Sequence, residues 1–133
     1  VCRNLCVMER RPWRRRAGMV ISNSRLVVCS YIGTTYLETL PNKIPTIIYE
    51  DFKNTSFRDE ALDDLYQLKK VNILFEDPKE ASVFINNNWN ELKKWWLSEN
   101  TQKVIDNFCF KYAKKNVHIV DDITNIIKNE ITN

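Results

Sequence analysis

The sequence predicts an α/β fold in which a partial parallel sheet is followed by several C-terminal helices. Short apolar runs rich in β-branched residues occupy residues 25–30, 45–49 and 73–75, and stretches of helical periodicity separate and follow them. Two buried strands joined through one helix form a βαβ unit, so we expect the first two strands to be parallel. A chain of 133 residues has room for one hydrophobic core.

The expected βαβ unit begins at residue 25 and ends at residue 49. Residues 25–30 form its first strand, and residues 35–40 follow as a short helix that Pro41 ends. Residues 45–49 form its second strand. Pro45 stands at the start of that strand, where a missing N–H is tolerated.

Helices dominate the rest of the expected fold. Leu65 and Leu68 lie on the apolar face of a helix that follows a polar loop at residues 50–57, and residues 73–75 form a third strand. Asp77, Pro78 and Glu80 have the N-cap, first-position and capping-box pattern of a helix start. Asn100 and Thr101 interrupt the apolar pattern that this helix begins. Further helices are therefore expected over the ranges 104–113 and 120–131.

Positive charge is concentrated at the start of the chain. Residues 1–25 carry seven Arg and one acid, a net charge of +6, whereas residues 26–133 sum to −3. The later residues are rich in Lys, Asn and Ile, whose codons are A/T-rich, whereas Arg codons usually are not. We therefore expect residues 1–21 to be a basic segment that is disordered or non-native, and residues 22–133 to be the domain. A start at Val1 fits a fragment of a longer protein.

An arginine run with one tryptophan occupies residues 10–16. Such runs bind RNA or anionic membranes through phosphate groups. No other feature supports nucleic-acid recognition, so we expect no nucleic-acid partner. A nucleic-acid binder with a basic arm is kept as an alternative.

Several classes of protein and site are excluded by what the sequence lacks. No apolar run approaches the roughly 20 residues of a membrane helix. The first residues are rich in arginine and lack the apolar core of a signal peptide, so a cytoplasmic protein is expected. His118 is the single histidine, and the four cysteines form no CxxC pair. We therefore expect no metal and no cofactor.

The first candidate site is the turn after the first strand. Gly33, Thr34 and Thr35 would bring backbone N–H groups and hydroxyls close to an anion at a helix N-terminus. Glu38, one turn into the helix, would accept hydrogen bonds from both hydroxyls of a ribose. The alternative is a plain capping box, in which Thr35 caps the helix and Glu38 reaches back to its backbone.

Two further groups have weaker signals. Arg58 could pair with a phosphate group through two parallel hydrogen bonds. The alternative is that residues 50–60 are an ordinary solvent-exposed loop that caps the next helix. Trp89, Trp95 and Trp96 could stack on a sugar. Their helical spacing favours a packing face instead.

The chain resembles the C-terminal half of GT-B glycosyltransferase-like proteins over about residues 22–116. The closest likeness is to a family of bacterial transferases of surface-carbohydrate assembly. Five stretches carry the resemblance: residues 24–40, with the strand, turn and helix of the donor site; residues 42–49, with the next strand; residues 58–61; Trp89 with Trp95 and Trp96; and residues 108–113. Residues 1–20 do not share it.

The resemblance implies a Rossmann-like domain that binds a nucleotide-activated sugar as substrate. Gly33, Thr34 and Thr35 would contact its diphosphate and Glu38 its ribose. In GT-B folds the loop after the second strand faces the interdomain cleft, so Tyr49 or Glu50 would contact the sugar or the base.

The resemblance also implies a missing partner. The N-terminal Rossmann half, which normally brings the acceptor site and the base, lies outside this sequence, so the catalytic residues are unknown and the fragment alone is expected to be inactive. Peripheral association with the inner face of the membrane is a further expectation. The alternatives are a nucleotide-sugar epimerase or polyol-phosphate transferase of the same fold, or a non-catalytic helical interaction module.

Overall fold

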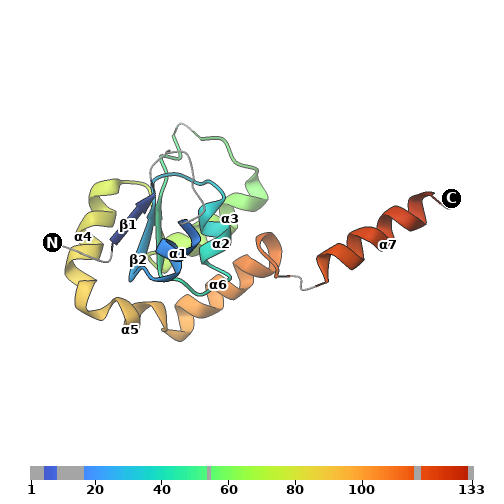
Figure 1. The fold of residues 1–133 in the computed structure, drawn as a ribbon. Coiled ribbons are helices and arrows are strands. Elements are labelled where there is room, and N and C mark those ends of the chain that lie inside the picture. The colour runs from blue at the N-terminus through green and yellow to red at the C-terminus, as the bar shows by residue number, and fades with distance from the viewer. Residues whose placement is uncertain (1–4, 9–16, 54, 116–117, 132–133) are drawn as a thin grey trace.

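A four-stranded parallel sheet forms the centre of the computed structural model, which describes residues 5–8, 17–53, 55–115 and 118–131 (Figure 1). The strands lie in chain order and are β1 (Leu5–Met8), β2 (Leu26–Cys29), β3 (Thr46–Tyr49) and β4 (Leu74–Phe75). Val28 pairs with Ile47, and Ile48 pairs with Leu74. The predicted α/β fold with a parallel sheet and following helices is confirmed.

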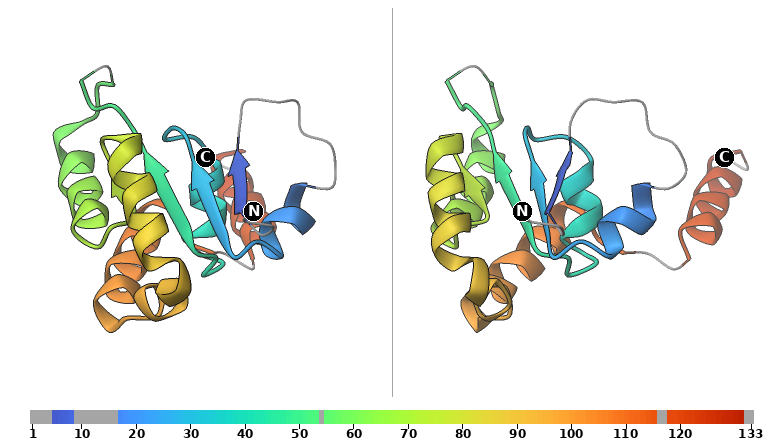
Figure 2. Two further views of the ribbon diagram at one scale, coloured as in Figure 1. Left: turned by 90° about the vertical axis from the view of Figure 1, so that its left-hand side faces the viewer. Right: turned by 60° about the vertical axis from the view of Figure 1, so that its left-hand side comes forward.

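Helices connect the strands and continue beyond them. Those between the strands are α1 (Ala17–Ser22), α2 (Thr35–Thr39) and α3 (Asp59–Lys70). After β4 come α4 (Pro78–Asn88), the short 3₁₀ turn η1 (Trp89–Glu91), α5 (Leu92–Trp96), α6 (Glu99–Tyr112) and α7 (Ile119–Ile131). Figures 1 and 2 show α7 lying away from the layers that the other elements form.

Helices cover both faces of the sheet. Successive residues of each strand point to opposite faces, so each strand contributes to two cores. Val27 and Ile48 belong to a core that α2, α3 and α6 complete with Leu40, Leu68 and Ile105, all fully buried. Leu26 and Ile47 belong to a second core on the other face, which α4 and α5 complete with Ala81 and Leu92. The resulting three layers can be followed in Figure 2.

The tryptophans pack as their spacing indicated. Trp96 is only 2% exposed, and its indole N–H donates to the backbone oxygen of Lys43 at 2.9 Å. Trp95 is half-buried between the two cores, and its indole N–H donates to the oxygen of Val71 at 2.8 Å. The packing interpretation is therefore confirmed for these two residues.

Two helix starts compare differently with the prediction. The start of α4 is confirmed, since the Asp77 carboxylate accepts a hydrogen bond from Lys79 N at 2.8 Å and Pro78 is the first helical residue. The expected break between two helices is present, but it lies at residues 97–98 and not at Asn100 and Thr101. The latter two residues lie in the first turn of α6, and the Ser98 hydroxyl caps that turn by accepting from Thr101 N at 3.4 Å.

The first segment contributes an edge strand that the sequence did not predict. Leu5 of β1 pairs with Leu26, and Met8 pairs with Cys29. The structure describes residues 5–8 and, from residue 17 onward, α1. The arginine run at residues 10–16 lies outside the described residues, and the non-native origin of residues 1–21 stays a prediction.

Candidate functional site

The candidate site lies at the edge of the sheet where β2 and β3 end. These strands are parallel neighbours with Cys29 opposite Ile48, so the loops that follow them emerge side by side. The first loop comprises residues 30–34 and leads into α2, and the second comprises residues 50–58 and leads into α3. The carboxyl ends of parallel strands are where ligands bind in open α/β sheets.

The loop at residues 30–34 is compact, and a glycine permits its shape. Gly33 N donates to the oxygen of Tyr31 at 3.0 Å. A Cβ atom at Gly33 would lie 2.4 Å from Cε2 of the Tyr31 ring, closer than carbon atoms can approach. The absence of a side chain at Gly33 therefore lets the Tyr31 ring, which is 41% exposed, lie against the loop backbone.

The helix that follows starts one residue earlier than the capping-box pattern implies. Its N-cap is Thr34, whose side chain makes no capping hydrogen bond, and Thr35 is the first helical residue. The capping box of Thr35 and Glu38 is therefore wrong as a description of this helix start. Thr34 and the Glu38 side chain are exposed at the edge of the sheet.

Glu50 connects the two loops through both of its carboxylate oxygens. Oε2 accepts a hydrogen bond from Ile32 N at 2.7 Å, and Oε1 accepts one from the Thr55 hydroxyl at 2.8 Å. Glu50 N in turn donates to the oxygen of Phe75 at 2.9 Å, which extends the pairing of β3 with β4. A backbone amide of the candidate phosphate loop thus already holds an anionic group.

The alternation of β3 separates Tyr49 from Glu50. Tyr49 is half-buried and packs against the second core, the one that α4 completes. Glu50 follows Ile48 by two positions and lies on the face that carries α2. The structure therefore places Glu50, but not Tyr49, beside the loop at residues 30–34.

Arg58 lies at the other end of the second loop. It is the exposed N-cap residue of α3, and its backbone oxygen accepts from Ala61 N at 2.9 Å. The intervening loop is held by Phe52, whose ring centroid lies 5.4 Å from that of Phe57 and 6.1 Å from that of Tyr66. The edge thus combines exposed polar groups with an aromatic cluster.

Sequence reasoning identified Glu50 but missed its bond to Ile32. The strand period offered a signal, because a residue two positions beyond the buried Ile48 is expected on the same face as the first loop. Tyr31 was also missed as a structural partner of Gly33. No pattern in the sequence marks a contact between a ring and a glycine two residues away.

The most perturbed titratable side chains lie elsewhere, where α3 meets α6. Asp64 accepts from Lys111 Nζ at 2.8 and 2.9 Å and from the Tyr112 hydroxyl at 2.7 Å. The Asp64 hydrogen bond, with a smaller effect of burial, raises the pKa of Tyr112 to about 12. Burial raises the pKa of Asp64, but the hydrogen bonds from Lys111 and Tyr112 outweigh it, so this pKa is lowered overall. These hydrogen bonds link α3 to α6.

Within the described residues, no group of three or more His, Cys, Asp or Glu side chains is placed to bind a metal ion. Each described helix is too short or too polar to cross a bilayer.

Comparison with known proteins gives one match. A protein-family model described as LIC12162 family transferase matches residues 2–127, which is nearly the whole chain and includes most of the basic first segment. The comparisons with curated proteins and with solved structures gave no match.

Proposed function

The chain belongs to the LIC12162 family of transferases, and we propose that it is the donor-binding part of a glycosyltransferase-type enzyme. Its donor would be a nucleotide-activated sugar, bound as substrate at the edge where β2 and β3 end. The proposed setting is the bacterial cytoplasm, in the assembly of surface polysaccharide or lipopolysaccharide. The transferase membership supports the reaction class, and the arrangement of the two loops supports the place.

One observation carries the proposed site most directly. The backbone N–H of Ile32 donates to a carboxylate oxygen of Glu50 at 2.7 Å, so an amide of this loop points between the two loops and already holds a negatively charged oxygen, which a diphosphate oxygen would have to replace. Gly33, Thr34 and Thr35 follow in the chain, and the loop ends at the start of a helix. Because α2 has only five residues, individual N–H groups and hydroxyls contribute more to anion binding here than a long helix dipole would.

The proposed mechanism is electrostatic stabilisation of the leaving group. As the bond between sugar and diphosphate breaks, negative charge accumulates on the diphosphate oxygens. The backbone N–H groups and hydroxyls of Thr34 and Thr35 would donate hydrogen bonds to those oxygens, and the Gly33 N–H would do so in place of its bond to Tyr31 O. Glu38, exposed one turn into α2, would accept from the ribose hydroxyls.

The second loop would complete the donor site. Glu50 is proposed to contact the sugar or base, since its carboxylate lies beside the first loop. Arg58 would reach a phosphate from the start of α3. Tyr49 would need to leave its packing against the second core to touch a ligand, so it is the weakest of these contacts.

No group in this chain is assigned as the base that deprotonates the acceptor. That group is proposed to lie in an N-terminal Rossmann half, the expected partner of this domain. The chain alone would then bind the donor without turning it over.

Isothermal titration of the full chain with a nucleoside diphosphate tests the proposal. Glu38→Ala should weaken the binding of nucleoside diphosphate much more than that of inorganic diphosphate, because only the nucleoside carries a ribose. Glu80→Ala, at an exposed position in the first turn of α4, is the matched control and should change neither affinity. Absence of nucleotide binding by the folded wild-type chain would contradict the proposed site.

The alternatives make different predictions. A nucleotide-sugar epimerase or polyol-phosphate transferase of the same fold would be recognised from the reaction products of the full-length protein. A non-catalytic interaction module is favoured by one observation, the exposed apolar side chains of α7, which include Ile123 and Ile127. Affinity for a partner protein, with none for nucleotides, would support that module.

A further inference from the structure

A cavity of about 600 Å³ lies at the opposite edge of the sheet, where β2 and β3 begin. Arg25 directly precedes β2, and Pro45 directly precedes β3. The other lining residues come mostly from η1 and α5. The full set, here called the amino-edge cavity, is Ser24, Arg25, Lys43, Pro45, Asn90, Leu92, Lys93, Trp96 and Leu97.

The apolar lining of the amino-edge cavity has a buried part and an exposed part. Leu92 and Trp96 are 1% and 2% exposed and connect the lining with the two cores. Leu97 is 58% exposed and lies at the cavity. An apolar group entering the cavity would therefore remove the Leu97 side chain from water.

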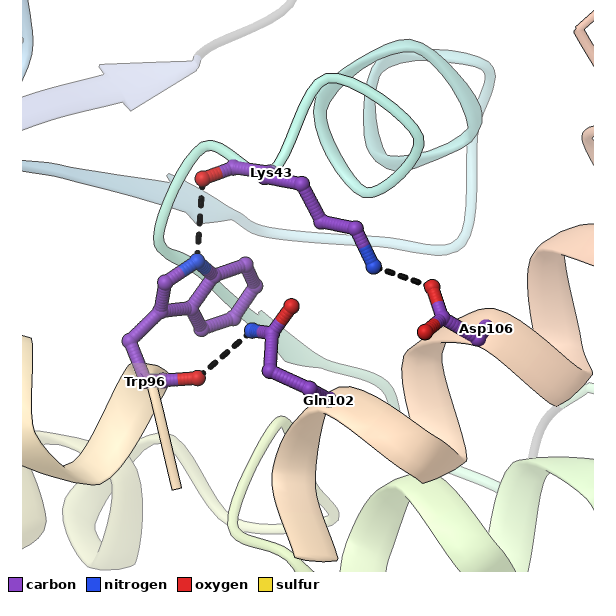
Figure 3. A network of polar contacts seen from close by, with 4 residues as sticks. All are labelled: Lys43, Trp96, Gln102 and Asp106. Atoms are coloured by element: carbon purple, nitrogen blue, oxygen red, sulfur yellow. Dashed lines mark hydrogen bonds and ion pairs between the residues drawn. The ribbon is translucent and has the colours of Figure 1, made fainter. Parts of the chain in front are cut away.

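Hydrogen bonds fix the wall that carries Trp96, as Figure 3 shows. The indole N–H donates to Lys43 O at 2.9 Å, and Gln102 Nε2 donates to Trp96 O at 2.6 Å. Lys43 has a positive φ of 56°, and its amine forms an ion pair with Asp106 of α6. The wall is thus pre-formed, and the charge of Lys43 is already neutralised.

Two cations of the amino-edge cavity are not neutralised. Among the described residues, neither Arg25 nor Lys93 forms an ion pair, and no lining residue is acidic. The Arg25 guanidinium donates to Trp89 O at 2.5 Å and lies 4.8 Å from the centroid of the Trp89 ring. These contacts hold the guanidinium in place and leave several of its N–H groups for another acceptor.

We propose that the amino-edge cavity binds an amphiphile with a phosphate head group and an apolar chain. The phosphate accepts hydrogen bonds from Arg25 and Lys93, since guanidinium and ammonium groups bind phosphate through charge-assisted hydrogen bonds. The apolar chain lies along Leu97 and Pro45, above the buried Trp96. This site is separate from the donor site, because it lies at the other end of the strands.

Neither half of such a ligand suffices alone. An inorganic anion would leave the Leu97 side chain in water, and a neutral apolar chain would leave two cations without a counter-charge. The combination satisfies both parts of the lining.

Titration of the full chain with decyl phosphate, below the concentration at which it forms micelles, tests the proposal. Inorganic phosphate and decyl maltoside are the two comparison ligands. Decyl phosphate should bind at least about tenfold more tightly than either, because it alone supplies both interactions. Equal binding of inorganic phosphate, or of the neutral detergent, would overturn the proposed ligand class.

Matched variants locate the site. Arg25→Gln should weaken the binding of decyl phosphate about tenfold, and Lys93→Gln should weaken it roughly threefold, since a held guanidinium donates more hydrogen bonds than a mobile amine. Lys79→Gln, at an exposed position on α4, removes the same charge elsewhere and should have no effect. The basic first segment is unchanged in all three, so an equal loss in Lys79→Gln and Lys93→Gln would overturn the assignment to this cavity.

Leu97→Ser separates the two halves of the ligand. The variant should weaken the binding of decyl phosphate about fivefold and leave the binding of inorganic phosphate unchanged, because only the alkyl chain of the ligand contacts Leu97. An unchanged affinity for decyl phosphate would overturn the proposed position of the chain. These results are independent of nucleotide binding at the other edge of the sheet, so either proposal can fail alone.

Discussion

The carboxylate of Glu50 accepts a hydrogen bond from the backbone N–H of Ile32 at 2.7 Å, and this bond joins the loops that follow β2 and β3. The other oxygen of the same carboxylate accepts from the Thr55 hydroxyl at 2.8 Å. One side chain therefore determines how the two loops of the candidate donor site lie relative to each other.

Replacing Glu50 should destabilise the protein according to how many of these bonds survive. Glu50→Ala leaves the Ile32 N–H without its acceptor and should cost about 1–3 kcal/mol of unfolding free energy, whereas Glu50→Gln keeps one acceptor and should cost less. Urea unfolding measures both. Equal stability of Glu50→Ala and the wild type would show that the loops do not depend on this bond.

Gly33→Ala should be destabilising because of the Tyr31 ring and not because of backbone strain. The added Cβ would lie 2.4 Å from Tyr31 Cε2, so the ring must move. Because the ring belongs to a side chain that is 41% exposed, it can turn away into solvent, and the expected loss is below about 1 kcal/mol.

A double-mutant cycle isolates this cause. In the Tyr31→Ala background the same glycine substitution should cost almost nothing, since no ring remains to be displaced. A full loss in that background would contradict the steric explanation.

Trp96→Phe should destabilise the protein through the lost indole N–H. The bond to Lys43 O joins α5 to the segment before β3, and its removal leaves a partly buried carbonyl without this donor, at a cost of about 0.5–1.5 kcal/mol, to which the smaller ring adds the cost of the cavity that it leaves in the core. Thermal unfolding measures the change. Trp89→Phe, at a half-buried ring whose indole N–H is not part of this link, is the control and should cost less.

The trio of Asp64, Lys111 and Tyr112 should make stability depend on pH at both extremes. The pKa of Asp64 is lowered from 3.8, so its contribution is present above pH 3.8 and is lost as the pH falls through the folded-state pKa. The pKa of Tyr112 is raised from 10.0 to about 12, so its contribution is present below pH 10.0 and is lost as the pH rises toward 12.

Two variants separate these contributions. Asp64→Asn should remove the acidic loss and reduce the alkaline one, because the raised pKa of Tyr112 depends on the Asp64 carboxylate. Tyr112→Phe should remove only the alkaline loss. Unfolding free energies measured across the pH range would contradict this account if both variants kept the alkaline loss of the wild type.

Local patterns were sufficient to predict β2, β3, β4 and the start of α4. Short β-branched runs and the sequence Asp77-Pro78 specify those elements without reference to distant residues. The edge strand β1 was missed because its apolar run stands beside the arginines of a segment whose composition suggested disorder. Its pairing with β2 is a non-local contact, which periodicity cannot reveal.

The candidate site was predicted as a set of residues but not as an arrangement. Position after a strand was enough to single out Gly33 and Glu50. Strand alternation predicts that Tyr49 and Glu50 point to opposite faces. The sequence could not show that Glu50 reaches the Ile32 amide, because this contact depends on how β3 lies beside β2. The break between two helices was placed too late in the sequence, at Asn100 and Thr101, because the Ser98 cap lets α6 begin before them.

The most direct test of the account is amide chemical-shift mapping of the full chain during titration with a nucleoside diphosphate. The proposed donor site predicts that the largest changes fall on residues 32–35 and on Glu50, whose carboxylate is hydrogen-bonded to the Ile32 amide. Glu38→Ala should reduce the affinity measured from those changes. Changes confined to other surfaces, or none at saturating ligand, would contradict the assignment of this edge as the donor site.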